Sequence, residues 1–138
     1  MKAHVDWVNK FHLHGTTEKG QTVRMDSVPG DETPKGATPK ELVLHAAAGC
    51  TMMDVVLILE KTKKHLEKFW IDVEGEVAKE HPKVFTKIHM TYHLVGKDLD
   101  DVCVERAIEL SLGKYCAVHA MLKNSVQMTH SYRIYKEL

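Results

Sequence analysis

One stretch of this 138-residue sequence decides its fold: TPKELVLHAAAGCTMMDVVLIL, which runs from Thr38 to Leu59. Two helix-start signals open it, because Thr38 and Glu41 have the spacing of a capping box and Pro39 occupies the first helical position. The rest is apolar around nearly the whole helical circumference, which is typical of a buried helix. We therefore predict a central helix over residues 38–64.

The same stretch is long enough to raise the possibility of a membrane span. His45, Thr51 and Asp54 lie inside it, and no second segment of this kind follows. A helix that is apolar on all sides in a soluble chain is one that runs through the middle of the fold. We therefore expect a core helix and no membrane association.

The segments on either side of this helix show the period-two alternation of half-buried strands. The pattern predicts N-terminal strands within residues 1–26, a loop over 27–37 and a hairpin over 68–96. A second helix and a short helix are predicted over 100–124, with Gly113 ending the second helix, and a last strand over 126–136. We expect one α+β domain over 1–138, with antiparallel sheets around two long helices.

Composition and charge exclude several classes of function. Nineteen basic and nineteen acidic residues give a net charge of zero, which argues against phosphate-reading nucleic-acid surfaces and against attraction to anionic membranes. Three cysteines without a C-x-x-C pair argue against a disulfide scaffold and against a zinc site. The first residues lack a signal-peptide pattern, so we expect a cytoplasmic protein with reduced thiols.

The cysteines are the first candidates for chemistry. Cys50 lies among small residues that leave room for a partner to approach, although a buried free cysteine often only fills space. Cys116 begins a new helical turn, where free N–H groups stabilise a thiolate and His119 could add a cation; packing is the alternative. Cys103 falls on the apolar stripe of its helix and is predicted to be a core residue.

Asp54 follows Cys50 by four residues, so both project from one side of the helix. A carboxylate there would raise the pKa of the thiol, so Asp54 needs a cationic partner. We predict an ion pair with Arg106 on the second long helix, either supporting Cys50 or purely structural.

Histidines also gather on two predicted strands. His12 and His14 share one strand face, as do His89 and His93, but no third ligand stands at a suitable spacing. We therefore expect neither a metal ion nor a cofactor.

Two motifs carry a resemblance to a known family. The residues Ala37-Thr38-Pro39-Lys40-Glu41-Leu42-Val43-Leu44, Ala48-Gly49-Cys50-Thr51 and Asp54-Val55-Val56 resemble the first helix of the OsmC/Ohr family. The residues Arg106-Ala107, Leu110-Ser111 and Lys114-Tyr115-Cys116 look like its second cysteine motif, and Thr129-His130-Ser131-Tyr132 suits its closing strand. The resemblance covers nearly the whole chain and is strongest to the YhfA-like branch.

The resemblance implies an intertwined homodimer and a thiol peroxidase that reduces organic hydroperoxides. Cys50 would become a sulfenic acid, Cys116 would resolve it as a disulfide, and a dithiol would reduce that disulfide. The sequence departs from the peroxidases in having Lys40 at the family's glutamate position and no arginine in the early loop. Glu41, Asp54 and Arg106 are the remaining supporting candidates. The alternative is a non-catalytic relative that binds a small apolar molecule at the dimer interface or senses redox state.

Overall fold

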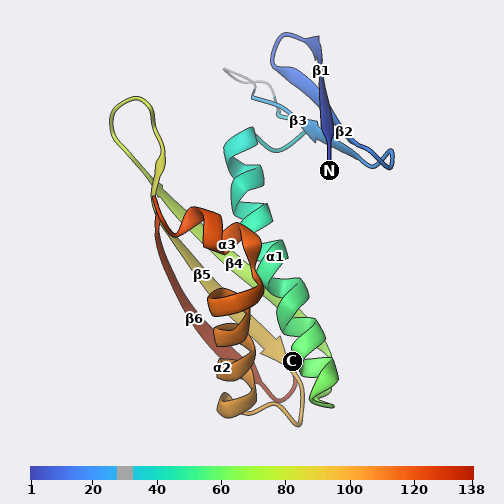
Figure 1. Ribbon diagram of the computed structural model, residues 1–138, viewed down its shortest axis with the longest axis vertical. Helices are drawn as coiled ribbons and strands as arrows, with labels where there is room; N and C mark the ends of the chain where they lie inside the picture. Colours follow the sequence, from blue (N-terminus) through green and yellow to red (C-terminus); the bar gives the residue numbers. More distant parts are fainter. Residues whose placement is uncertain (28–32) are drawn as a thin grey trace. The chain divides into compact units, whose positions relative to one another are not determined.

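The computed structural model describes residues 1–27 and 33–138, which form two compact units, Met1–Val43 and Leu44–Leu138. The first unit holds three antiparallel strands in the order β1 (Ala3–Asn9), β2 (His12–Thr17) and β3 (Thr22–Met25) (Figure 1). Of the loop predicted over 27–37, residues 28–32 lie outside the described residues.

A buried carboxylate organises the end of this small sheet. Asp26 follows β3 and is fully buried, and its Oδ2 lies 3.0 Å from Nδ1 of His12 on β2. The same oxygen accepts a hydrogen bond of 2.9 Å from the backbone N–H of Lys35. Because a buried carboxylate is costly unless it has partners, these contacts fix the returning chain beside β2 and β3.

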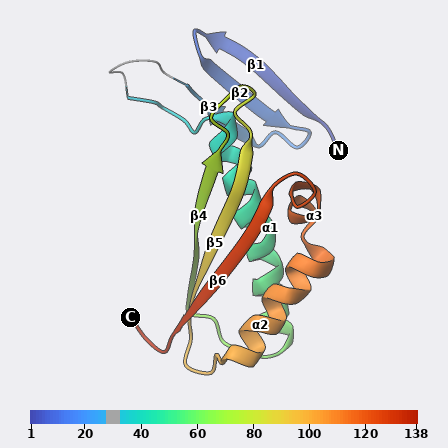
Figure 2. The same ribbon diagram turned by 90° about the vertical axis from the view of Figure 1, so that its left-hand side faces the viewer.

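The second unit is built on a sheet in which β5 (Phe85–Val95) is central, between β4 (Lys68–Val77) and β6 (Gln127–Tyr135) (Figure 2). β4 and β5 form the expected antiparallel hairpin, but β5 and β6 run parallel. The prediction of purely antiparallel sheets is therefore wrong for the last strand. The helical segment between β5 and β6 carries the chain back along the sheet, and such a crossover makes the two strands parallel.

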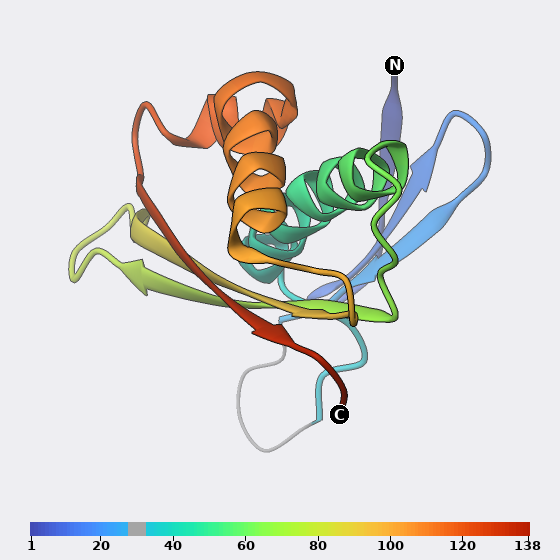
Figure 3. The same ribbon diagram turned by 90° about the horizontal axis from the view of Figure 1, so that it is seen from below.

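Two helices cover one face of this sheet: α1 (Pro39–Lys61), here from Leu44 onward, and α2 (Asp101–Leu110) (Figure 3). α1 is long and apolar enough to cross a membrane by length and composition, a test that core helices of soluble proteins also pass. Its buried residues recur every four positions: Ala47, Thr51, Val55 and Leu59. The opposite side is open, and Met53 is 77% exposed. Burial on all sides, as predicted from the sequence, is therefore wrong for this single chain, because the sheet and α2 contact only one side of α1.

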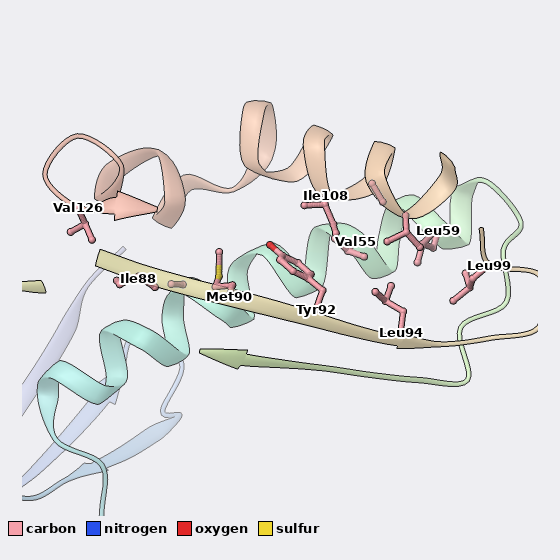
Figure 4. Packing of buried hydrophobic residues seen from close by; sticks show 12 residues of the cluster. Val55, Leu59, Ile88, Met90, Tyr92, Leu94, Leu99, Ile108 and Val126 are labelled. Carbon is pink, nitrogen blue, oxygen red and sulfur yellow. The ribbon is translucent and has the colours of Figure 1, made fainter. Parts of the chain in front are cut away.

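The core lies between β5 and the two helices. Alternate residues of β5 point toward the helices and meet apolar side chains of α1 and α2 (Figure 4). The central members are Ile88, Met90, Tyr92 and Leu94 from β5, Val55 and Leu59 from α1, and Ile108 from α2. Tyr92 is buried completely, although it carries a hydroxyl group.

The sequence pattern predicted that the second helix ends at Gly113, but the helical segment continues past this residue. α2 begins at an Asp100 cap and continues directly into a π-helical turn, η1 (Ser111–Tyr115), which contains Gly113. In this turn the backbone N–H of Cys116 donates to the carbonyl of Ser111 at 2.8 Å. Cys116 then caps the short helix α3 (Ala117–Leu122). Gly113 therefore lies inside a turn whose hydrogen bond spans five residues instead of four, and it does not end the helical segment.

Candidate functional site

Cys50 and Cys116 come together in the second unit. Cys50 projects from α1 and is partly exposed, whereas Cys116, at the junction of η1 and α3, is only 2% exposed. Both are free thiols, and Cys50 lies close enough that its thiol and its charge raise the pKa of Cys116. The pair of cysteines identified in the sequence is therefore a spatial pair.

The electrostatic setting of Cys116 differs from the sequence prediction. The pKa of this thiol is raised to about 11, mainly by burial and to a smaller extent by Cys50 and Asp54. The backbone N–H of His119 donates to its sulfur at 3.4 Å and opposes the rise. Stabilisation of a thiolate by the helix start is therefore outweighed by desolvation. His119 supplies no cation either, because burial, helped by Lys123, lowers its pKa.

Asp54 lies beside Cys50 on α1 but not in the predicted ion pair. Its Oδ2 accepts a hydrogen bond of 2.8 Å from Ser111 Oγ. Among the ion pairs of the described residues, none joins Asp54 to Arg106. Both side chains do line one cavity of about 320 Å³ between α1 and α2, together with apolar residues such as Leu57 and Leu110. The prediction that Asp54 and Arg106 lie in one region is confirmed. The predicted ion pair is wrong, because Ser111, in the turn after α2, donates to the Asp54 carboxylate instead.

Three hydroxyl residues complete the site, and sequence reasoning assigned them no role. Thr51 Oγ1 lies 2.8 Å from Ser111 Oγ and 2.9 Å from the hydroxyl of Tyr92. Thr51 and Ser111 stand inside the cysteine motifs, but nothing in the sequence indicates that they meet. The available signal was the presence of a threonine on a long apolar helix.

Glu41 belongs to the start of α1 in the first unit. Its carboxylate accepts the backbone N–H of Thr38 at 2.7 Å, and its own N–H donates to Thr38 Oγ1 at 3.2 Å. This is the predicted capping box, and it accounts for Glu41 without a catalytic role. Lys40, at the position of the family's glutamate, precedes it in the first turn.

The histidines have partners of other kinds. His89 is hydrogen-bonded to Thr129 and Ser131, whereas His93 contacts Tyr135 and Asp72. Over residues 1–27 and 33–138, no three His, Cys, Asp or Glu side chains are grouped so that they could hold a metal ion.

Comparison with known proteins identifies the family of the chain. The family model described as OsmC-like protein matches residues 30–131. Protein YhfA of Escherichia coli K12 is 39% identical over 134 residues, which cover 97% of this chain and 98% of YhfA.

Solved structures extend the likeness to the fold. A hypothetical protein from Aquifex aeolicus VF5 has a TM-score of 0.85 and 28% identity, over 96% of this chain and 94% of that one. An organic hydroperoxide resistance protein OsmC from Legionella pneumophila has a TM-score of 0.69 and 16% identity, covering 96% of each chain, and shares the fold alone. With two cysteines brought together by this fold, and with matches that span most of its length, the chain belongs to the OsmC-like family.

Proposed function

We propose that this protein is a cytoplasmic thiol-dependent peroxidase that reduces organic hydroperoxides through Cys50 and Cys116. The observation that carries the proposal is the proximity of these two free thiols, one partly exposed and the other buried. A hydroperoxide resistance protein with the same fold gives supporting analogy, although 16% identity transfers no activity by itself.

The difference in exposure supports a different role for each cysteine. Cys50 can meet a peroxide from outside, while Cys116 is shielded and remains a protonated thiol at neutral pH because its pKa is about 11. In the first step the Cys50 thiolate attacks the terminal oxygen of the hydroperoxide, the O–O bond breaks, and the alkoxide takes a proton from solvent water and leaves as an alcohol. Cys50 is thereby oxidised to a sulfenic acid.

In the second step the sulfur of Cys116 attacks the sulfur of Cys50. The S–O bond breaks, the proton of Cys116 leaves with the hydroxyl group as water, and a disulfide forms. An external dithiol then reduces this disulfide by thiol–disulfide exchange and regenerates both thiols.

We further propose that the working form is a homodimer, as the family resemblance implies. The open side of α1 carries large apolar side chains, including Met53, Val56 and Leu57, which a second copy would cover. Analytical ultracentrifugation tests this point, and a monomer at micromolar concentration would contradict it.

The function itself is tested by mass spectrometry of the reduced protein after brief exposure to equimolar cumene hydroperoxide. A disulfide between Cys50 and Cys116 should appear within seconds, while Cys103 stays a free thiol. Cys103→Ser is the matched control and should behave as the wild type does. If all three thiols survive, the peroxidase proposal is wrong.

The cavity between α1 and α2 favours one alternative function, the binding of a small apolar molecule without catalysis. Its volume is about 320 Å³ and its lining mixes Leu57, Ile58 and Leu110 with polar residues. Saturable fluorescence of an apolar dye, together with thiols that do not react with peroxide, would support this alternative. Dye binding should then weaken in Leu110→Asp.

A further inference from the structure

A chain of four hydrogen-bonded side chains crosses the core beside the cysteines. The hydroxyl of Tyr92 on β5 lies 2.9 Å from Thr51 Oγ1 on α1, which lies 2.8 Å from Ser111 Oγ in η1. Ser111 in turn donates to Asp54 at 2.8 Å. Tyr92, Thr51 and Ser111 are each 0% exposed, so the chain runs through the dry interior and ends at the half-buried carboxylate of Asp54.

Counting hydrogens fixes the direction of every bond in this chain. A hydroxyl has a single hydrogen to donate, and that of Ser111 goes to Asp54. Thr51 must therefore donate to Ser111, and Tyr92 must donate to Thr51. Burial raises the pKa of Tyr92 to about 12, so its hydroxyl keeps the hydrogen that this arrangement requires. All three hydroxyl donors are satisfied in one direction, toward the carboxylate.

The same chain links the backbones of the two cysteines. Thr51 follows Cys50 directly in α1, and the carbonyl of Ser111 accepts the backbone N–H of Cys116 at 2.8 Å. Two hydrogen bonds in series therefore connect α1, which carries Cys50, to the backbone of Cys116. One is the contact between the hydroxyls of Thr51 and Ser111, and the other closes the π-helical turn.

Packing alone does not account for three buried hydroxyls. A buried hydroxyl group costs free energy unless it is hydrogen-bonded, and apolar side chains of the same shape fill such a site without that cost. A π-helical turn is much rarer than continued α-helix and is frequently found at functional sites. Here the turn is tied to α1 by its first residue and delivers Cys116 with its last hydrogen bond.

We propose that Thr51, Ser111 and Tyr92 are positioning residues of the cysteine pair, which hold η1 so that Cys116 stays opposite Cys50. The role of the pair rests on the proposed function, but its alignment is a property of the fold. Thr51 is the central member, because it contacts both other hydroxyls and adjoins Cys50 in the chain.

The test compares Thr51→Val, which keeps the shape and removes the hydroxyl, with Thr51→Ser, which keeps the hydroxyl and removes a methyl group. The equilibrium constant for forming the Cys50–Cys116 disulfide is measured in glutathione redox buffers by mass spectrometry, without any peroxide. We expect it to fall on the order of tenfold in Thr51→Val and to stay near the wild-type value in Thr51→Ser. An unchanged constant in Thr51→Val, or equal losses in both variants, would overturn the proposal.

Two further measurements keep the result interpretable. Thermal unfolding shows whether each variant is folded. If Thr51→Val does not fold, Tyr92→Phe replaces it in the test. Tyr92→Phe removes only the hydroxyl at the end of the series and should also lower the equilibrium constant for disulfide formation. Reaction with cumene hydroperoxide is measured separately. A wild type that closes the disulfide in glutathione but ignores the peroxide refutes the proposed function and leaves the positioning role intact.

Discussion

The buried setting of Cys116 predicts an unusual pH dependence of its alkylation. Its pKa is raised from 9.0 to about 11, with burial as the largest cause. Because only the thiolate reacts with iodoacetamide, the raised pKa gives Cys116 a thiolate fraction at neutral pH about a hundredfold lower than that of an unshifted thiol. The rate at Cys116 should therefore continue to rise about tenfold per pH unit beyond pH 9.

The assay is peptide-resolved mass spectrometry after timed alkylation between about pH 7 and about pH 11, with circular dichroism at each pH to show that the protein is folded. Asp54→Asn is the matched variant. It removes a negative charge that contributes to the raised pKa of Cys116, so the midpoint should fall. It should stay above the ordinary value, because burial is the larger cause. A wild-type rate that levels off at or below about pH 9 would refute the reasoning.

Three further predictions concern stability. Leu59→Ala empties a fully buried site and should cost about 2–5 kcal/mol in urea unfolding, whereas Val102→Ala, at a position 77% exposed on α2, should stay within about 0.5 kcal/mol. The pKa of Asp100 is lowered, first by the backbone N–H of Cys103, so its contribution is present above its ordinary pKa and is lost as the pH falls through the lowered one. Asp100→Asn should keep the cap and weaken this acid dependence of the unfolding midpoint. The raised pKa values of Cys116 and Tyr92 act in the opposite direction, so stability should decline from about pH 9 upward, and less steeply in Tyr92→Phe; an equal decline in both would contradict this.

Features that depend on neighbouring residues could be predicted from the sequence. The predicted capping box of Thr38 and Glu41 is present in the structure. Strand alternation likewise predicts which residues of β5 face the helices, and Ile88 and Met90, two positions apart, are both buried in the structure. These signals are reliable because the interacting atoms lie within a few residues of one another.

Features that depend on the path of the chain could not be predicted in this way. The alternation in β6 is the same whether it pairs parallel or antiparallel with β5, and the crossover through α2 decides between them. Gly113 looked like a helix stop because a glycine often ends a helix, yet here it lies in a turn of wider hydrogen bonding.

The candidate site shows the same division. The motif resemblance selected Cys50 and Cys116, and these thiols are close in the structure. The predicted pair of Asp54 and Arg106 failed because charge alone suggested the partner. Ser111, an uncharged residue fifty-seven positions from Asp54 in the sequence, donates a hydrogen bond to the carboxylate instead.

Thr51 illustrates why the hydroxyl chain escaped prediction. The phase of a helix is the rotation about its axis that decides which residues face the core. In a helix that is apolar around its circumference, the sequence does not reveal this phase, so the buried side cannot be distinguished from the open side. In such a helix a threonine looks like an interruption of the apolar run. Once the structure fixes the buried stripe at Ala47, Thr51, Val55 and Leu59, the same residue becomes a buried hydroxyl that must find partners. Its partners lie forty-one and sixty residues away, so the argument from burial to Tyr92 and Ser111 becomes available only when the phase of α1 is known.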